Sequence, residues 1–279
     1  MSQGSGTVEI RGELVRKRYA REELQAEHAK AQALWECARR HEFVAPRPLR
    51  VDEAASAIEY ERIAGFSALT GPYVREMSTG DLHGRLAAIL REVARVLAAI
   101  HQDLRLPVTR PWEAPPLLLQ GLRRAGDRDG RSATVGPRAV LHGDFGFSNL
   151  AVLPSDGPRP RIAVIDPSPN GFTTLRVDLE GPVLVDLALF TSCVEGRIPL
   201  RQQPRIRWSA LGGLREVFVA AYEGAAGTAL DLEALGMLQY ATAYAYFSRV
   251  YGAGLRREAA LALLYNRLKG NRRWWEGRP

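Results

Sequence analysis

Cysteine, histidine and methionine are scarce in this chain, and their scarcity excludes several ways of building a protein. Among 279 residues there are 2 cysteines and 5 histidines, too few for a disulfide framework or a cluster of metal-binding thiolates. A pair of isolated cysteines, Cys37 and Cys193, is typical of a reducing compartment. The first residues, MSQGSGTVEIRGE, are polar and lack the apolar centre of a secretory signal peptide. We therefore expect a cytoplasmic protein.

Long apolar runs are also missing. The longest, GPVLVDLALFTSCV, is interrupted by Asp186 and is shorter than the run of about 18 residues that a membrane-spanning helix needs. Hydrophobic residues make up 46% of the chain and charged residues 25%, which is ordinary globular composition and excludes disordered and fibrous classes. The length suits one large domain or two lobes with an ample core.

Negative charge is in deficit, since 38 Lys and Arg residues outnumber 31 Asp and Glu residues for a net charge of +7. This excess favours anionic partners such as nucleotides, phosphorylated substrates, nucleic acids or acidic lipid headgroups. The C-terminal RLKGNRRWWEGRP sets arginines beside tandem tryptophans, which suits contact with an anionic membrane or a nucleic acid. The alternative, which we favour, is a last helix whose tryptophans pack on the protein. We do not expect a nucleic-acid-binding protein.

Hydrophobic periodicity separates a small strand-rich N-terminal part from a larger helical part. TVEIRG and ELVRKRYA alternate apolar and polar residues around Gly12, which predicts a hairpin. Residues 21–40 have the period of a helix, and FVAPRPLRV and SAIEYERIAG are typical of two further strands. The sequence therefore predicts an α+β fold, with an N-terminal lobe over residues 1–65 and a C-terminal lobe over residues 66–279.

The C-terminal part is predicted to be mainly helical. A long helix is expected over residues 79–101, and AVLHGD and RIAVIDP are typical of two short buried strands. From residue 181 the pattern is helical nearly to the end. Clefts between lobes are favoured ligand sites, so the residues just past the junction are the first place to look for chemistry.

The most informative stretch is VLHGDFGFSNLAV, followed after one turn by IAVIDPSP. It brings His142, Asp144 and Asn149 close together in sequence and puts Asp166 at the end of the next apolar run. Two interpretations compete: buried polar groups that hold a core together, or a site for moving a phosphate. Mg²⁺ is usually held by one or two carboxylates plus substrate phosphates, and this set of side chains meets that demand. A base-like Asp beside an Asn and an Asp that bind metal is what phosphoryl transfer needs.

Three motifs carry a resemblance to a known family. HGDFGFSN resembles the H-G-D-x-x-x-x-N catalytic loop of the aminoglycoside phosphotransferase family, within the protein-kinase-like superfamily. VIDP resembles that family's metal-binding Asp, and VLVDLALF resembles the helix start whose Asp braces the catalytic loop. All three occur in the family's order between residues 140 and 190. The resemblance implies a bilobal protein-kinase-like fold, with one helix on a small antiparallel sheet and a larger, mainly helical lobe.

The resemblance also implies a role for each motif residue. Asp144 is the expected catalytic base, and Asn149 and Asp166 are the expected ligands of Mg²⁺. Asp186 is the expected structural brace. His142 is expected to orient the catalytic loop rather than to take part in the chemistry. ATP is the expected phosphate donor, with GTP as the alternative.

A lobe of this type requires a strand lysine that pairs with a glutamate on the following helix. Strand periodicity puts Lys17 on the same face as Val15. Helix periodicity puts Glu27 on an apolar stripe, where a charge needs a partner. We predict an ion pair between Lys17 and Glu27 that orients the α- and β-phosphates, with Glu23 as the reserve partner. The alternative is a solvated surface lysine.

The connection between the lobes and the start of the chain bear on nucleotide binding. YERIAGFSAL resembles the family's inter-lobe hinge, where backbone groups of Glu61 to Ile63 would contact an adenine. The family's lobe normally opens with a strand before a phosphate-covering loop, whereas only MSQGSG precedes the first strand expected here. We therefore expect that loop to be short or absent.

The acceptor and two rival functions stay open. The C-terminal part carries RQQPRIRW, GLRREAA and NRLKGNRRWW, which would repel a polycationic aminoglycoside. We expect a neutral or anionic hydroxyl compound instead: a sugar, a sugar phosphate, a lipid-linked glycan or another small metabolite. One rival is a catalytically inactive kinase-like binding or scaffold protein. The other, a protein kinase, is disfavoured because Gly146 stands where those enzymes have a lysine two residues after the base.

Overall fold

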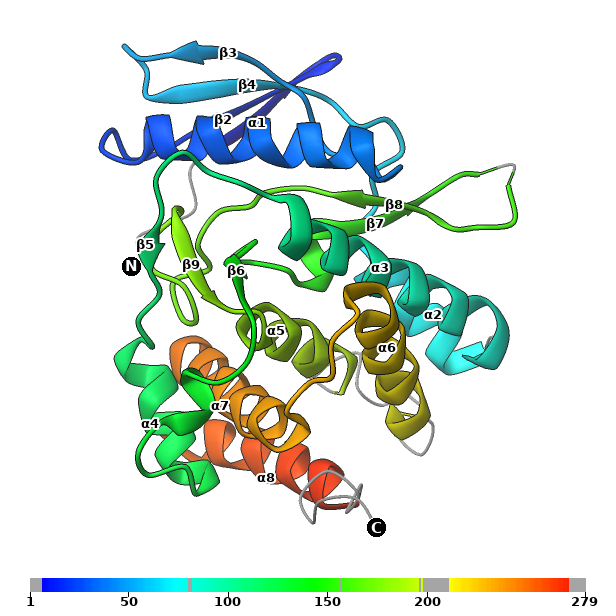
Figure 1. Cartoon of the computed structure of the whole chain (residues 1–279), viewed down its shortest axis with the longest axis vertical. Helices are drawn as coiled ribbons and strands as arrows, with labels where there is room; N and C mark the ends of the chain where they lie inside the picture. Colours follow the sequence, from blue (N-terminus) through cyan, green and yellow to red (C-terminus); the bar gives the residue numbers. More distant parts are fainter. Residues whose placement is uncertain (1–6, 80–81, 156, 196, 198–210, 271–279) are drawn as a thin grey trace.

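The computed structural model describes residues 7–79, 82–155, 157–195, 197 and 211–270. These residues form two lobes, one built on a sheet and a larger one built mainly on helices (Figure 1). The predicted α+β class and the two-lobe arrangement are therefore confirmed. The division predicted at residues 65 and 66 stays a prediction.

The N-terminal lobe is a four-stranded antiparallel sheet in the order β1-β2-β4-β3, with helix α1 lying across it (Figure 1). Gly12 makes the turn of the first hairpin with a φ of 58°, a left-handed conformation that costs glycine little. One face of α1 packs on the sheet through Leu24 and Ala31, which contact Ile58 and Tyr60. The strands are β1 (Val8–Arg11), β2 (Leu14–Arg18), β3 (Pro48–Asp52) and β4 (Ala57–Glu61), and α1 spans Leu24–Arg40. The predicted hairpin, helix and two strands are confirmed.

The C-terminal lobe combines helices with two small sheets. One sheet has the order β5-β9-β6 and the other pairs β7 with β8. The strands are β5 (Arg110–Pro111), β6 (Arg138–Val140), β7 (Leu150–Leu153), β8 (Arg161–Val164) and β9 (Leu179–Pro182). The α-helices are α2 (Thr70–Thr79), α3 (Ala87–Asp103), α4 (Pro116–Ala125), α5 (Leu184–Val194), α6 (Leu211–Ala226), α7 (Leu232–Tyr251) and α8 (Leu255–Gly270). A π-helical turn spans Leu82–Leu86, and 3₁₀ turns span Arg131–Ala133 and Phe147–Asn149.

Helix α5 is the interior element of this lobe, because every one of its residues is buried. A helix that is apolar nearly all round belongs in a core. The main core cluster surrounds it with residues of α3, α6 and α7 and reaches the C-terminal half of α1. The lobes are also joined by backbone, since Val44 pairs with Ala163 of β8 and the Val44 N–H donates to the Ile162 carbonyl at 2.9 Å. The residues around the catalytic motifs therefore rest on the packed centre of the molecule.

Several elements differ from the sequence prediction. The helix expected over residues 79–101 begins at Ala87, because α2 ends at Thr79 and a π-helical turn separates the two. Helix α4 was not predicted, since its PPLLLQGLRR sequence opens with prolines that are equally typical of a linker. RQQPRIRW and the end of RLKGNRRWWEGRP lie outside the described residues. No helix in the described part of the chain is both long and apolar enough to cross a membrane.

Candidate active site

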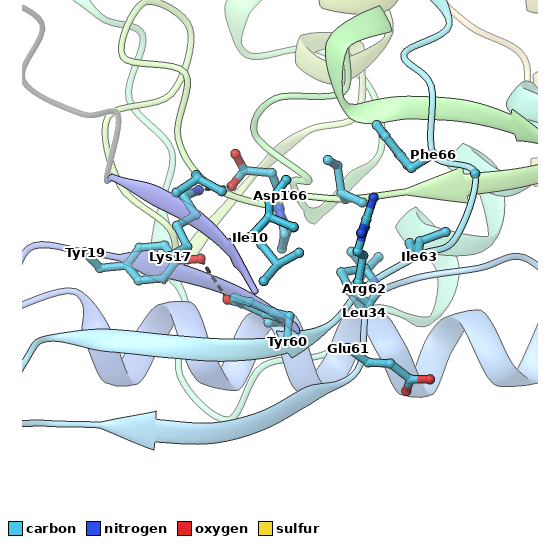
Figure 2. A pocket seen from close by; sticks show the side chains of 17 residues that line it. Ile10, Lys17, Tyr19, Leu34, Tyr60, Glu61, Arg62, Ile63, Phe66 and Asp166 are labelled. Atoms are coloured by element: carbon cyan, nitrogen blue, oxygen red, sulfur yellow. Dashed lines mark hydrogen bonds and ion pairs between the residues drawn. The ribbon is translucent and has the colours of Figure 1, made fainter. Parts of the chain in front are cut away.

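A cavity of about 370 Å³ lies between the N-terminal sheet and the end of β8 (Figure 2). Four of the predicted site residues line it: Lys17, Glu61, Ile63 and Asp166. The rest of its wall is mainly apolar and is made by Val8, Ile10, Val15, Tyr19, Ala31, Leu34, Pro46, Tyr60, Arg62, Gly65, Phe66, Ile165 and Pro167. Such a wall with a few polar groups suits a flat, partly polar ligand.

The hinge side of this cavity offers backbone rather than side chains. The Glu61 side chain is exposed and points away from the cavity (Figure 2). The Arg62 N–H donates to the Glu13 carbonyl at 2.9 Å and is occupied. The Ile63 N–H, by contrast, donates to no carbonyl or side chain in the described residues. An unused donor beside an apolar wall is available to a ligand.

The predicted catalytic loop is fixed by the first turn of α5. Asp186 is fully buried and accepts hydrogen bonds from the N–H groups of His142 at 2.6 Å and Gly143 at 3.0 Å. His101 on α3 contacts the same carboxylate at 3.2 Å. Although burial alone would raise the pKa of Asp186, its hydrogen bonds to His101 and the loop hold that pKa below the usual range. Asp186 is therefore an ionised acceptor placed inside the core to hold a loop.

Asp144 and Asn149 are joined within that loop. The Asn149 amide nitrogen donates to the Asp144 carboxylate at 2.8 Å and to the Asp144 carbonyl at 2.9 Å. Since both contacts are acceptors, the nitrogen must face Asp144, and the amide oxygen faces elsewhere. Burial raises the pKa of Asp144 to about 6, and the positive charge of Arg197 opposes that rise. The carboxylate is thus mainly ionised at neutral pH but more basic than an ordinary aspartate.

Asp166 is brought beside Asn149 by the pairing of β7 with β8. The Ile165 N–H donates to the Asn149 carbonyl at 2.9 Å, directly after the registered pair Leu150 and Val164. Asp166 then turns into the cleft with a φ of 55°, a left-handed conformation that is uncommon for a residue with a side chain. Such local strain is found at functional sites more often than elsewhere.

His142 is fully buried, and its contacts are those of a residue that orients the loop. Its Nδ1 accepts from the Asp144 N–H at 3.3 Å, so the ring proton belongs on Nε2. Nε2 has no hydrogen-bond partner in the described residues. Burial lowers the pKa of His142 to about 4, so the ring is neutral.

The residues present fit one hard cation held jointly with a ligand. The Asn149 amide oxygen and the Asp166 carboxylate are oxygen ligands of the type that Mg²⁺ prefers, and the amide oxygen accepts no hydrogen bond in the described residues. No group of three or more His, Cys, Asp or Glu in that part of the chain is arranged to hold a metal alone. A cation here would need phosphate oxygens to complete its ligands.

The prediction of a direct ion pair between Lys17 and Glu27 is wrong, because Lys17 pairs with a different carboxylate. The Lys17 ammonium pairs with the Asp166 carboxylate and contacts the Ser168 hydroxyl at 3.2 Å. That hydroxyl donates to Glu27 at 2.8 Å, so Ser168 bridges the two predicted partners. Neither Glu27 nor Glu23 forms an ion pair with Lys17 in the described structure.

The charges explain this choice of partner. Burial raises the pKa of Glu27 to about 7, so its carboxyl is only partly ionised near neutral pH. Burial alone would also raise the pKa of Asp166, but the Lys17 ammonium more than offsets it and holds that pKa below its ordinary value. The ammonium lies against the carboxylate with the fuller charge, and this contact is itself the main reason that Asp166 stays ionised. Glu27 is left as a buried hydrogen-bond acceptor behind it.

One residue with a place in this network was missed by the sequence analysis. Lys30 is fully buried on α1 and donates to the carbonyls of His142 at 3.0 Å and Val177 at 2.7 Å. It thereby ties α1 to the catalytic loop. Burial lowers the pKa of Lys30 to about 8, although the carboxylate of Glu27 opposes that fall. Its position three residues after Glu27, on the same inward stripe, was the signal that could have found it.

No family model and no curated protein matches this chain. Solved structures do match it. Glucosamine kinase in complex with glucosamine, ADP and inorganic phosphate is 17% identical, with a TM-score of 0.62 over 95% of this chain and 79% of that chain. A choline/ethanolamine kinase family protein from Mesorhizobium loti is 14% identical, with a TM-score of 0.57 over 97% of this chain and 86% of that chain.

A third solved structure also matches this chain. The choline kinase LicA from Streptococcus pneumoniae is 12% identical, with a TM-score of 0.54 over 95% of this chain and 90% of that chain. These three structures match nearly the whole length of the chain, and the structural matches establish its fold. The chain therefore has the bilobal protein-kinase-like fold, shared with small-molecule kinases, that its sequence motifs implied.

Proposed function

We propose that this protein is an ATP-dependent phosphotransferase that moves the γ-phosphate to a hydroxyl group of a neutral or anionic small molecule or glycan. One observation carries the proposal. Asp144 and Asn149, on one loop, and Asp166, on the next strand end, meet at the edge of the cavity that Lys17 lines. In kinases, an Asp base together with an Asn and an Asp that bind metal is the arrangement that supports phosphoryl transfer.

Asp144 is the proposed base. As the acceptor oxygen forms its bond to the γ-phosphorus, the bond from that phosphorus to the bridging oxygen of the nucleotide breaks and ADP leaves. The hydroxyl proton passes to the Asp144 carboxylate. Because burial raises the pKa of Asp144 to about 6, the carboxylate is ionised at neutral pH and still basic enough to accept a proton.

Asn149 and Asp166 are the proposed holders of Mg²⁺. When bound, Mg²⁺ would neutralise charge on the phosphate oxygens. The Asn149 amide is already aimed by its two hydrogen bonds to Asp144, which orient its oxygen away from the base. Because the side chain is already ordered, less conformational entropy is lost when the cation binds.

Lys17 and the hinge are the proposed nucleotide contacts. The apolar wall of the cavity suits an adenine ring, and the unused Ile63 N–H suits one of its ring nitrogens. Lys17 would contact the α- and β-phosphates, with Ser168 and Glu27 behind it to keep it in place. GTP is the alternative donor.

The acceptor class follows from the charge of the chain and from its structural neighbours. The matched structures bear the names of a glucosamine kinase and of choline kinases, which supports a small hydroxyl-bearing acceptor here. The net charge of +7 favours a neutral or anionic one. The rival protein-kinase function loses support because these neighbours are small-molecule kinases. The rival inactive scaffold loses support because Asp144, Asn149 and Asp166 come together.

The experiment is a screen of the purified chain for ADP release. Mg²⁺-ATP and Mg²⁺-GTP are offered with neutral sugars, amino sugars, sugar phosphates and other hydroxyl metabolites, and Asp144→Asn serves as the matched control. We expect at least one hydroxyl compound to give ADP with the parent chain and not with the control. Tight ATP binding without turnover over the whole panel would favour the scaffold instead.

A further inference from the structure

Arg197 lies just beyond α5, beside the catalytic loop, and no sequence motif singled it out. One guanidinium nitrogen donates to the Cys193 sulfur at 2.8 Å. The guanidinium carbon lies 5.3 Å from the ring centre of Phe172 and 4.8 Å from that of Tyr246. Two aromatic faces and a sulfur hold the cation from several sides. Contacts with aromatic faces are attractive, but they do not neutralise a charge.

The charge of Arg197 is left without a carboxylate. It forms no ion pair in the described residues, and its buried Nε has no hydrogen-bond partner there. Arg215, on α6, shows the usual arrangement, since its buried guanidinium lies 3.2 Å from the Glu195 carboxylate. A buried or half-buried cation without a counter-ion lowers stability. Arg197 therefore has no direct counter-ion among the described residues, and its guanidinium is available to an anionic ligand.

Arg197 faces the loop that carries the base. A side-chain carbon built on Gly146, two residues after Asp144, would lie 3.3 Å from an Arg197 nitrogen, so the guanidinium occupies the space in front of that glycine. Asp144 is also the carboxylate whose negative charge acts on Arg197. The cation and the base therefore border the same volume, and the glycine lets them approach.

We propose that Arg197 is a catalytic residue that binds a phosphate-type oxyanion beside Asp144, namely the phosphoryl group while it is transferred. The inference rests on the proposed function and adds to it the group that meets the developing charge. A guanidinium presents planar donors that match phosphate oxygens, and it does so here from a position fixed by Phe172 and Tyr246. Arg197 gives up no proton, and its donors stabilise the oxygens of the phosphoryl group as the bond to ADP breaks.

The same chemistry has a second source, an anionic group on the acceptor itself. Water as the acceptor separates the two sources, because it carries no anion. If Arg197 meets the phosphoryl group, removing it slows ATP hydrolysis by water as much as transfer to any hydroxyl compound. If hydrolysis stays at the parent rate and only phosphorylated acceptors are lost, the proposal for the phosphoryl group is overturned.

The kinetic test uses Arg197→Met, Arg197→Lys and Arg249→Met in the full chain. Arg249 is the matched control, because it donates to the Gly171 carbonyl at 2.8 Å, next to Phe172, while pairing with nothing in the catalytic loop. We expect Arg197→Met to lower the ADP formation rate at saturating ATP by about 100-fold or more, with the KM for ATP nearly unchanged. Arg197→Lys should fall between it and the parent, and Arg249→Met should match the parent.

A binding test separates this inference from the proposed function. Calorimetric titration with inorganic phosphate in the presence of ADP should show binding to the parent and to Arg249→Met, and none to Arg197→Met. That pattern in a chain that never releases ADP would end the proposed function and leave the oxyanion site standing. Parent-like phosphate binding and turnover in Arg197→Met would overturn the inference and leave the proposed function intact. If Arg197→Met does not fold, the test is made with Arg197→Lys. We expect weakened phosphate binding in that variant, and parent-like phosphate binding would overturn the inference.

Discussion

The catalytic loop and the Lys17 network form two halves of one site, and they are built in opposite ways. In the loop, a buried carboxylate, Asp186, holds backbone N–H groups at 2.6 and 3.0 Å, and Asn149 holds Asp144. In the N-terminal lobe, the long side chain of Lys17 reaches across the cleft to Asp166 and Ser168. The loop is held in the core by hydrogen bonds to its backbone. The N-terminal half depends instead on contacts between side chains, and Lys17 has more than one partner there.

The difference shows which parts of a site a sequence can reveal. The loop depends on residues a few positions apart and on one helix start, so a motif describes it nearly completely. The partner of Lys17 depends on where Ser168 lies and on which carboxylate keeps its charge, and both follow from tertiary burial. We expect mutations in the loop to damage fold and activity together, and mutations around Lys17 to weaken nucleotide binding and turnover while sparing the fold.

The largest effect on folding is expected at the loop. Asp186→Ala leaves two buried N–H donors without their acceptor, at about 1–3 kcal/mol for each. Urea denaturation should show that loss, together with loss of activity. Asp103→Ala is the control, because Asp103 pairs with His41 at the surface and its removal should cost less than about 1 kcal/mol. Equal losses in the two variants would contradict the contrast between buried and exposed carboxylates.

Lys17→Ala should break the other half of the site while sparing the fold. A charge-assisted contact to phosphate is worth about 1.5–3 kcal/mol, so affinity for ATP should fall by about 10- to 100-fold. Turnover should also fall, and the melting temperature should change little. Nucleotide titration measures this, with Arg18→Ala as the control, because Arg18 lies next to Lys17 on β2 and its side chain is 55% exposed. ATP binding at the parent level in Lys17→Ala would remove Lys17 from the nucleotide-binding residues.

Glu27→Gln should give the smallest effect, and one that depends on pH. Burial raises the pKa of Glu27 to about 7, so the parent's carboxyl is mostly neutral at pH 6, and glutamine resembles that form. At pH 8 the parent is ionised and Lys17 loses a negative charge in the variant. The KM for ATP should therefore match the parent at pH 6 and exceed it by about 2- to 10-fold at pH 8. A difference that is the same at both pH values would mean that Glu27 keeps its charge throughout.

The sequence revealed the fold where patterns are local and strong. The hairpin at Gly12, helix α1 and the strands β6 and β8 have clear patterns, and the order of Asp144, Asn149 and Asp166 pointed to one site. Helix α4 was not predicted, because the prolines at its start are equally typical of a linker.

Three side chains with a place in the site were not predicted, and their partners could not be found from the sequence. Lys30 and Ser168 act through partners more than 100 residues away along the chain, at separations of 112 and 141. Arg197 is one arginine among many until its lack of a carboxylate is visible. Distant pairing of this kind is set by packing, which no local pattern encodes.

Asp144→Asn tests the central claim most directly, through pre-steady-state ADP formation beside ATP titration of the same sample. The substitution keeps the size and shape of the side chain and removes its negative charge and its ability to accept a proton. We predict parent-like ATP affinity and melting temperature, with the chemical step slowed by about 100-fold or more. ADP formation at the parent rate would contradict the assignment of Asp144 as the base, and with it the mechanism proposed for this site.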